Sequence, residues 1–139
     1  MLSDLLRGIA AAAISVLFVH QVIVFILHKS GLWPGKPYST APVGPLGVPT
    51  ILNSVFWGGV WGVVYALFHE MLPAAPTWLH GVTFGCLMAV FSNSLLVPLL
   101  KRQPLFFDFD VKKLVSVFLI LSGFGAGLAL LYEALRPYI

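Results

Sequence analysis

Polar side chains that can donate or accept hydrogen bonds interrupt the most apolar parts of this sequence. They are His20 and Gln21, then Ser92, Asn93 and Ser94, and finally Ser122. In apolar surroundings such groups need partners, because burying one without a hydrogen bond costs roughly 2–7 kcal/mol. Two uses follow from this. The side chains form a clasp that joins helices, or they line a narrow polar constriction for water, a small neutral solute or an ion with its water shell.

The histidines raise the further hypothesis of a haem, because histidine is a common axial ligand and helical bundles hold haems. His20 lies within an apolar stretch, whereas His69 and His80 flank one short turn. Two histidines at helix ends are more often interfacial residues. The single cysteine, Cys86, is expected to pack as a small residue. We therefore expect no metal site and no resident cofactor, with haem at His20 or at His69 and His80 as the alternative.

Enzyme motifs are missing from the sequence. It contains no HExxH, no GxSxG and no phosphate-binding loop. No Asp, Glu, Lys or Arg lies at the middle of an apolar stretch, which removes the usual carriers of protons and ions inside a membrane. The sequence therefore predicts no catalytic residue and a protein that is not an enzyme.

The composition indicates the class of protein that holds these polar groups. Hydrophobic residues make up 59% of the 139 residues, charged residues 9%, and the mean hydropathy is +0.96. The apolar residues form runs long enough for a helix to cross a bilayer core of roughly 30 Å. We predict an all-α integral membrane protein, a single four-helix domain over residues 1–139. Its spans are expected at about residues 8–27, 51–72, 78–100 and 114–135.

The segment between the first two spans, residues 28–50, is rich in proline and glycine. Its five prolines exclude a regular helix. One interpretation is a loop along the membrane interface, with Trp33 and Tyr38 as interfacial aromatic residues. The other is that the uncharged part, "STAPVGPLGVP", folds back between the helices and lines a cavity, where protein or water satisfies its backbone.

Basic residues predict the orientation, because translocation across the membrane disfavours Lys and Arg. Both long loops are basic, with Lys29, Lys36, Lys101, Arg102, Lys112 and Lys113, against Arg7 and Arg136 on the other side. This predicts cytoplasmic loops and outward-facing termini (N-out/C-out), in a bacterial inner membrane. The net charge of +3 is mostly this topology signal, so the expected partner is the lipid bilayer and not nucleic acid.

A weak internal repeat relates the two halves of the chain. At an offset of 73 residues Gly8 aligns with Gly81 and His20 with Asn93, and at an offset of 63 Gly62 aligns with Gly125. This pattern favours a duplicated helical hairpin, although apolar segments also match by chance. Two spans per unit would make the halves parallel, related by an axis along the membrane normal.

Small residues four apart occur in every span, and they predict close helix packing. The residues expected to pack are Gly8, Gly58, Gly59, Gly62, Gly81, Gly85, Gly123 and Gly127. Such faces hold a bundle together, or they present a surface to a partner or to a second copy.

Two functional hypotheses follow. The first is a non-catalytic accessory or scaffold subunit of a membrane-protein complex or homo-oligomer, assembling through its glycine-rich faces and its proline-rich loop. The second is a homo-oligomeric channel or transporter for a small polar solute, whose path passes His20, Gln21, Asn93 and Ser94.

Overall fold

The computed structural model describes all 139 residues, and its four long apolar helices confirm the predicted four-helix membrane architecture. Span 1 consists of α1 (Leu2–Ser15), η1 (Val16–His20) and α2 (Gln21–Lys29), and span 2 of α3 (Thr50–Phe68) and η2 (His69–Met71). Span 3 consists of α4 (Thr77–Met88), η3 (Ala89–Leu96) and α5 (Val97–Lys101), and span 4 is α6 (Val111–Ala134).

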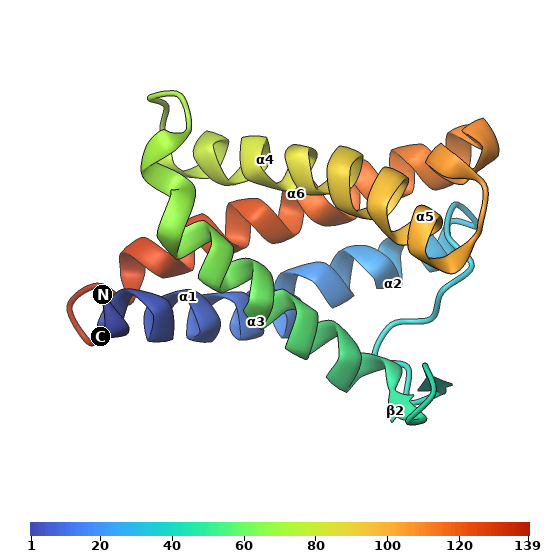
Figure 1. Cartoon of the computed structure of the whole chain (residues 1–139), viewed down its shortest axis with the longest axis horizontal. Helices are drawn as coiled ribbons and strands as arrows, with labels where there is room; N and C mark the ends of the chain where they lie inside the picture. The colour runs from blue at the N-terminus through green and yellow to red at the C-terminus, as the bar shows by residue number, and fades with distance from the viewer.

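The four spans alternate in direction, as short connections require. Both termini and the turn at residues 72–76 lie at one end of the bundle, here called the termini end (Figure 1). The segments at residues 30–49 and 102–110 lie at the other end, the loop end (Figure 1). The two helical hairpins therefore run parallel to each other.

The loop end carries the remaining short elements. The proline-rich segment contains a small antiparallel hairpin of β1 (Pro42–Val43) and β2 (Val48–Pro49). Its turn uses Gly44 and Gly47, both at positive φ, where a side chain would be strained. The second loop contains η4 (Leu105–Phe109), in which Phe106, Phe107 and Asp108 have left-handed backbone angles with positive φ. Asp110 then caps α6 by accepting a hydrogen bond from the Lys113 backbone N–H at 3.2 Å.

Span 1 is longer than the sequence predicted. It begins at Leu2 rather than near residue 8, because Asp4 and Arg7 pair one turn apart, at 3.2 Å, and remain helical. A helix of 28 residues is about 42 Å long, which exceeds a hydrocarbon core of roughly 30 Å. Span 1 must therefore tilt or extend beyond the core, and its charged first turn accounts for part of that excess.

Each helical hairpin is held together by a crossing at which the backbones of its two helices touch, with no side chains between them. In the first hairpin Gly8 lies against the backbone of Gly62, and any side-chain carbon at either residue would collide with the other's carbonyl group. In the second hairpin Gly81 and Gly125 stand in the same relation. With little hydrophobic drive between helices in lipid, such contacts supply dispersion and weak hydrogen bonding.

The two crossings occupy matching places in the chain. Gly81 follows Gly8 by 73 residues, and Gly125 follows Gly62 by 63, the offsets that align the halves of the sequence. Gly85, four residues after Gly81, contacts the Leu121 carbonyl. The counterparts of this second pair, Ala12 and Gly58, also lie together, with the Ala12 carbonyl 3.9 Å from where a Gly58 Cβ would be.

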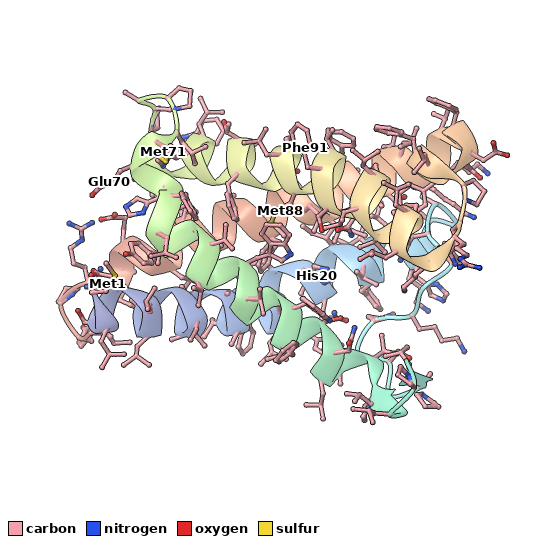
Figure 2. All side chains as sticks on the ribbon, in the orientation of Figure 1. Met1, His20, Glu70, Met71, Met88 and Phe91 are labelled. Carbon is pink, nitrogen blue, oxygen red and sulfur yellow. The ribbon has the colours of Figure 1, made fainter.

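A π-helical turn occurs at the same place in spans 1 and 3. The first covers Val16–His20, and the second, Ala89–Leu96, begins 73 residues later. π-helical turns are rare, and they frequently mark functional sites. Both turns carry polar residues near the middle of the bundle, which is where His20 lies (Figure 2).

Replacing Gly62 with alanine is expected to destabilise the bundle by about 1–3 kcal/mol, because the new methyl group must push α1 away from α3. The measurement is the thermal unfolding midpoint of the purified protein in detergent. Gly59→Ala is the matched control, since the nearest atom to a Cβ there is a side-chain carbon of Ile9 at 3.8 Å. Equal midpoints for the two variants would contradict a packed crossing at Gly62.

Candidate functional site: a polar cleft between α3 and α4

A cleft lies between two helices that follow each other in the chain. From the turn at residues 72–76, α3 and α4 diverge, and α3 crosses α1 obliquely while α4 runs along α6 (Figure 1). The space between them is a cavity of about 450 Å³. It extends from Asn53 and Lys101, near the loop end, to Val64 and Met88 deeper in the bundle.

Polar side chains from three spans line this α3–α4 cleft. They are His20 from η1, Asn53 and Ser54 from α3, and Ser92 and Asn93 from η3. No hydrogen bond within the chain uses the side chains of the last four. Their polar atoms are not fully enclosed by protein, so they remain free to bond to a molecule in the cleft. The arrangement is therefore suited to water or to a polar ligand that supplies the missing partners.

The Gln21 side chain orients the His20 ring from outside the cleft. The Tyr38 backbone N–H donates to Gln21 Oε1 at 2.7 Å, which places the Gln21 amide nitrogen beside His20 Nδ1 at 3.1 Å. Because an amide nitrogen only donates, Nδ1 accepts, and the neutral ring carries its proton on Nε2. His20 thus keeps a free donor, and its ring packs edge-on against Phe124 at 6.2 Å.

The proline-rich loop returns alongside span 1. Its Tyr38 hydroxyl donates to the carbonyl of Leu17, within the π-helical turn. Gln21 lies eight residues before the end of α2, or about 12 Å along the helix. The loop therefore reaches the level of the polar residues but lies beside Gln21, whereas the α3–α4 cleft is lined by helical residues alone.

The structure brings together only part of the cluster predicted from the sequence. His20, Ser92 and Asn93 share the cleft. Gln21 faces the loop, Ser122 bonds to the Leu119 carbonyl of its own helix at 3.3 Å, and Ser94 is buried with no partner for its hydroxyl. No direct hydrogen bond links spans 1 and 3 through these groups. Spans 1 and 4 are instead joined by Ser15, which donates to the Phe124 carbonyl at 2.8 Å.

Asn53 and Ser54 line the cleft but were not singled out from the sequence. They sit in the first turns of α3, where polar residues are ordinary at a helix start. The available signal was their adjacency inside an apolar span, the same pattern as in "SNS" at residues 92–94.

Aromatic side chains close the cleft towards the termini end. Beyond Val64 and Met88, the Tyr65 ring is buried against two other aromatic rings. Its ring centroid lies 5.2 Å from that of Phe84 and 5.5 Å from that of Tyr132. Trp61 contacts Phe84 from the cleft side at 6.3 Å. The polar cavity therefore ends at an aromatic layer within the bundle.

The internal repeat relates the cleft to a second interface, between α6 and span 1, and this second interface is closed. There α6 packs on span 1, with Gly123 against Val19 and Ile23, and with Gly127 against Ser15 and Val19. The repeat offset of 63 residues relates Gly123 and Gly127 to Val60 and Val64. The offset of 73 residues relates Ser15, Val19 and Ile23 to Met88, Ser92 and Leu96. All five counterparts line the cleft.

Two valines thus stand where two glycines permit close approach on the other side. The valine side chains project into the cleft lining, whereas the glycines let side chains of span 1 pack directly against the α6 backbone. Val60 and Val64 lie four residues apart and so share one face of α3. This difference explains why one interface is packed and the matching one is open.

The cleft contains a single formal charge. Lys101 lines it near the loop end, and no Asp or Glu side chain lines it. Carboxylates are the usual ligands for cations such as Mg²⁺ and Ca²⁺ in proteins. The lining therefore favours neutral or anionic solutes over cations.

The histidines named in the haem alternative lie at two separate places, with His20 in the cleft and His69 beside His80. His69 and His80 meet edge to face at 6.5 Å near the termini end, and His69 also stacks on Tyr65 at 5.1 Å. His69 Nδ1 bonds to the Tyr65 carbonyl at 3.0 Å. No group of three His, Cys, Asp or Glu side chains lies close enough to hold a metal ion.

Comparison with known proteins does not assign a family. No family model, no curated protein and no solved structure gives a significant match to this chain.

Replacing both Val60 and Val64 with glycine is expected to close the cleft. The face of α3 towards span 3 would then lack side chains at the two positions that are glycine where α6 faces span 1. Spin labels at Asn53→Cys and Lys101→Cys, with Cys86→Ser, report the separation of the two helices. We expect the label distance to shorten by several ångströms.

The control for this experiment is Val63→Gly with Leu67→Gly, which removes side chains at the same spacing from positions that do not line the cleft. A label distance unchanged by Val60→Gly/Val64→Gly would contradict the role of the two valines as spacers.

Proposed function

We propose that the protein is a small membrane transporter that admits a polar solute from the loop end into the α3–α4 cleft. The observation that carries this proposal is the convergence of His20, Asn53, Ser54, Ser92 and Asn93 on one cavity, which extends from the loop end to the middle of the bundle, where His20 lies (Figure 2). Asn53, Ser54, Ser92 and Asn93 have no hydrogen-bond partner in the chain. Most of the other lining residues are apolar, and the unpaired polar side chains among them favour water or a polar solute as the occupant over a lipid chain.

The solute class follows from the lining. Amide, hydroxyl and imidazole groups offer both donors and acceptors, which suits a small neutral molecule with several hydrogen-bonding atoms. Lys101 also tolerates a small anion near the loop end. The absence of a carboxylate from the lining argues against a metal cation as cargo.

A change of shape is required for transport, since the aromatic layer of Trp61, Tyr65 and Phe84 closes the cleft towards the termini end. The matching π-helical turns of spans 1 and 3 are suitable hinges, because a π-helical turn interrupts the regular α-helical hydrogen bonding. We further propose that the two hairpins arose by duplication, and that rocking of one against the other moves the solute.

The orientation we propose places the loop end in the cytoplasm of a bacterial inner membrane. Six of the eight basic side chains belong to the loop end, from Lys29 to Lys113, whereas Arg7 and Arg136 belong to the termini end. The solute would then enter the cleft from the cytoplasm.

An accessory or scaffold role is the second candidate, and the hairpin of β1 and β2 favours it. The hairpin projects at the loop end, and Leu46 at its turn is 87% exposed. An apolar tip on a rigid turn is suited to contact with another membrane protein or with a second copy of this chain. In this role Asn93 would serve assembly rather than flux.

Replacing Asn93 with leucine separates the two candidates. In proteoliposomes shrunk by an external pulse of a small neutral solute such as glycerol or urea, the protein is expected to speed the re-swelling that follows as the solute enters, measured by light scattering. Asn93→Leu is expected to reduce this protein-dependent flux at least about tenfold, the equivalent of about 1.4 kcal/mol. Size-exclusion chromatography should show unchanged assembly.

Phe91→Leu is the matched control, because Phe91 lies in the same π-helical turn but is 61% exposed on the outside of the bundle (Figure 2). Flux unchanged by Asn93→Leu would contradict a path through the cleft. Loss of assembly in that variant, with no flux in the native protein, would instead support the accessory role.

A further inference from the structure

A second cavity, of about 400 Å³, lies at the termini end, away from the α3–α4 cleft. Charged side chains of both signs line it: Asp4 and Arg7 from α1, Glu70 from η2, and Arg136 just after α6. Glu70 lies at the end of the bundle that also holds Met1 (Figure 2). We call this cavity the termini-end pocket. The site proposed for solute transport does not use it.

Arg7 is the most buried charged group of the pocket. Its side chain is only 9% exposed, and its guanidinium lies over the Tyr132 ring, 5.0 Å from the centroid. One terminal nitrogen bonds to Asp4 at 3.2 Å, while Nε is buried and has no hydrogen-bond partner. A buried cationic donor without an acceptor is costly. The second terminal nitrogen has no hydrogen-bond partner in the chain and is not fully enclosed, so an anionic group in the pocket would accept from it.

The pocket also offers acceptors for a cation. Glu70 lines it and forms no ion pair within the chain. His69 donates through Nδ1 to the Tyr65 carbonyl, so its neutral ring presents Nε2 as an acceptor. Arg136 pairs with Glu133 at 2.8 Å and also lines the pocket. Two basic and two acidic side chains thus line one cavity.

We propose that the termini-end pocket binds a phosphoethanolamine group, with the phosphate against Arg7 and Arg136 and the ammonium against Glu70. The Met1 ammonium also lines the pocket and pairs with Asp4 at 2.9 Å, so Glu70 is the acidic side chain left free for the ammonium of a ligand that carries one charge of each sign. Planar guanidinium groups are well suited to phosphate. The ligand is the headgroup of a lipid or the free compound, and the test distinguishes these sources.

Position favours the lipid as the source. The pocket lies at the ends of the spans, the level at which headgroups meet a bundle. Leu67 lines the pocket and is 47% exposed, so an acyl chain can leave the pocket along an apolar surface. Lipid headgroup sites between spans commonly combine basic side chains with such apolar edges.

The test is native mass spectrometry of the purified full chain titrated with dioleoyl phosphatidylethanolamine or dioleoyl phosphatidylglycerol. These lipids share their acyl chains and differ in the ammonium group. We expect one phosphatidylethanolamine per chain to bind about tenfold more tightly than phosphatidylglycerol. Arg7→Gln should weaken both lipids about tenfold.

Glu70→Gln keeps the proposal testable if Arg7→Gln fails to fold, because Glu70 is exposed and carries no structural bond. This variant should lose the preference for phosphatidylethanolamine while still binding phosphatidylglycerol. Lys36→Gln, at the loop end, is the control and should change neither lipid's affinity.

Competition with free phosphoethanolamine identifies the source of the headgroup. Displacement of the lipid at micromolar concentration would assign a soluble ligand, and failure to displace it would assign the lipid; both outcomes support the headgroup chemistry. Equal retention of the two lipids by the native protein, with free phosphoethanolamine not bound, would overturn the proposal. A preference that survives Glu70→Gln would overturn it as well.

Discussion

Contact between helix backbones at Gly8 with Gly62, and at Gly81 with Gly125, is the constraint on which the rest of this structure depends. In lipid, apolar side chains gain little by meeting one another, so helices associate where small residues let their backbones touch. The two crossings fix each hairpin near the termini end and leave the other ends free to diverge. Without them α3 would have no fixed position against span 1, and no defined space would exist between α3 and α4.

The α3–α4 cleft arises because two interfaces that correspond in sequence are packed differently. Gly123 and Gly127 let α6 close on span 1, whereas the corresponding residues of α3, Val60 and Val64, line an open cleft. In water an apolar gap of this kind would collapse, but in a membrane lipid or solute can fill it. The polar side chains at its depth make water or a polar solute the better occupant. A duplicated hairpin with one interface modified is a simple route to such a site.

Much of the architecture was predictable from the sequence, because span length and composition are determined by bilayer thickness. Those quantities predicted the four helices correctly, but not the start of α1 at Leu2. The charged residues Asp4 and Arg7 remain helical there because they pair with each other one turn apart. The depth of His20 and Asn93 was also predictable from their places within the spans.

What the sequence did not predict was which polar groups face one another. Facing depends on helix rotation, and the π-helical turns alter that rotation by lengthening one turn of spans 1 and 3. Gln21 therefore meets Tyr38 of the loop rather than span 3. Asn53 and Ser54 were not predicted because polar residues are ordinary in the first turns of a helix. They line a cleft only because α3 diverges from α4, which the sequence does not indicate.

The most direct test of a polar cleft open at one end is the reactivity of a single thiol placed in it. Cys86→Ser removes the native cysteine, and Asn93→Cys then reports from the cleft to a membrane-impermeant maleimide in sealed vesicles of either orientation. The account predicts rapid labelling from the loop end and at least about tenfold slower labelling from the termini end, the equivalent of about 1.4 kcal/mol. Labelling that is equally slow from both sides would contradict it, because the cleft would then hold no water.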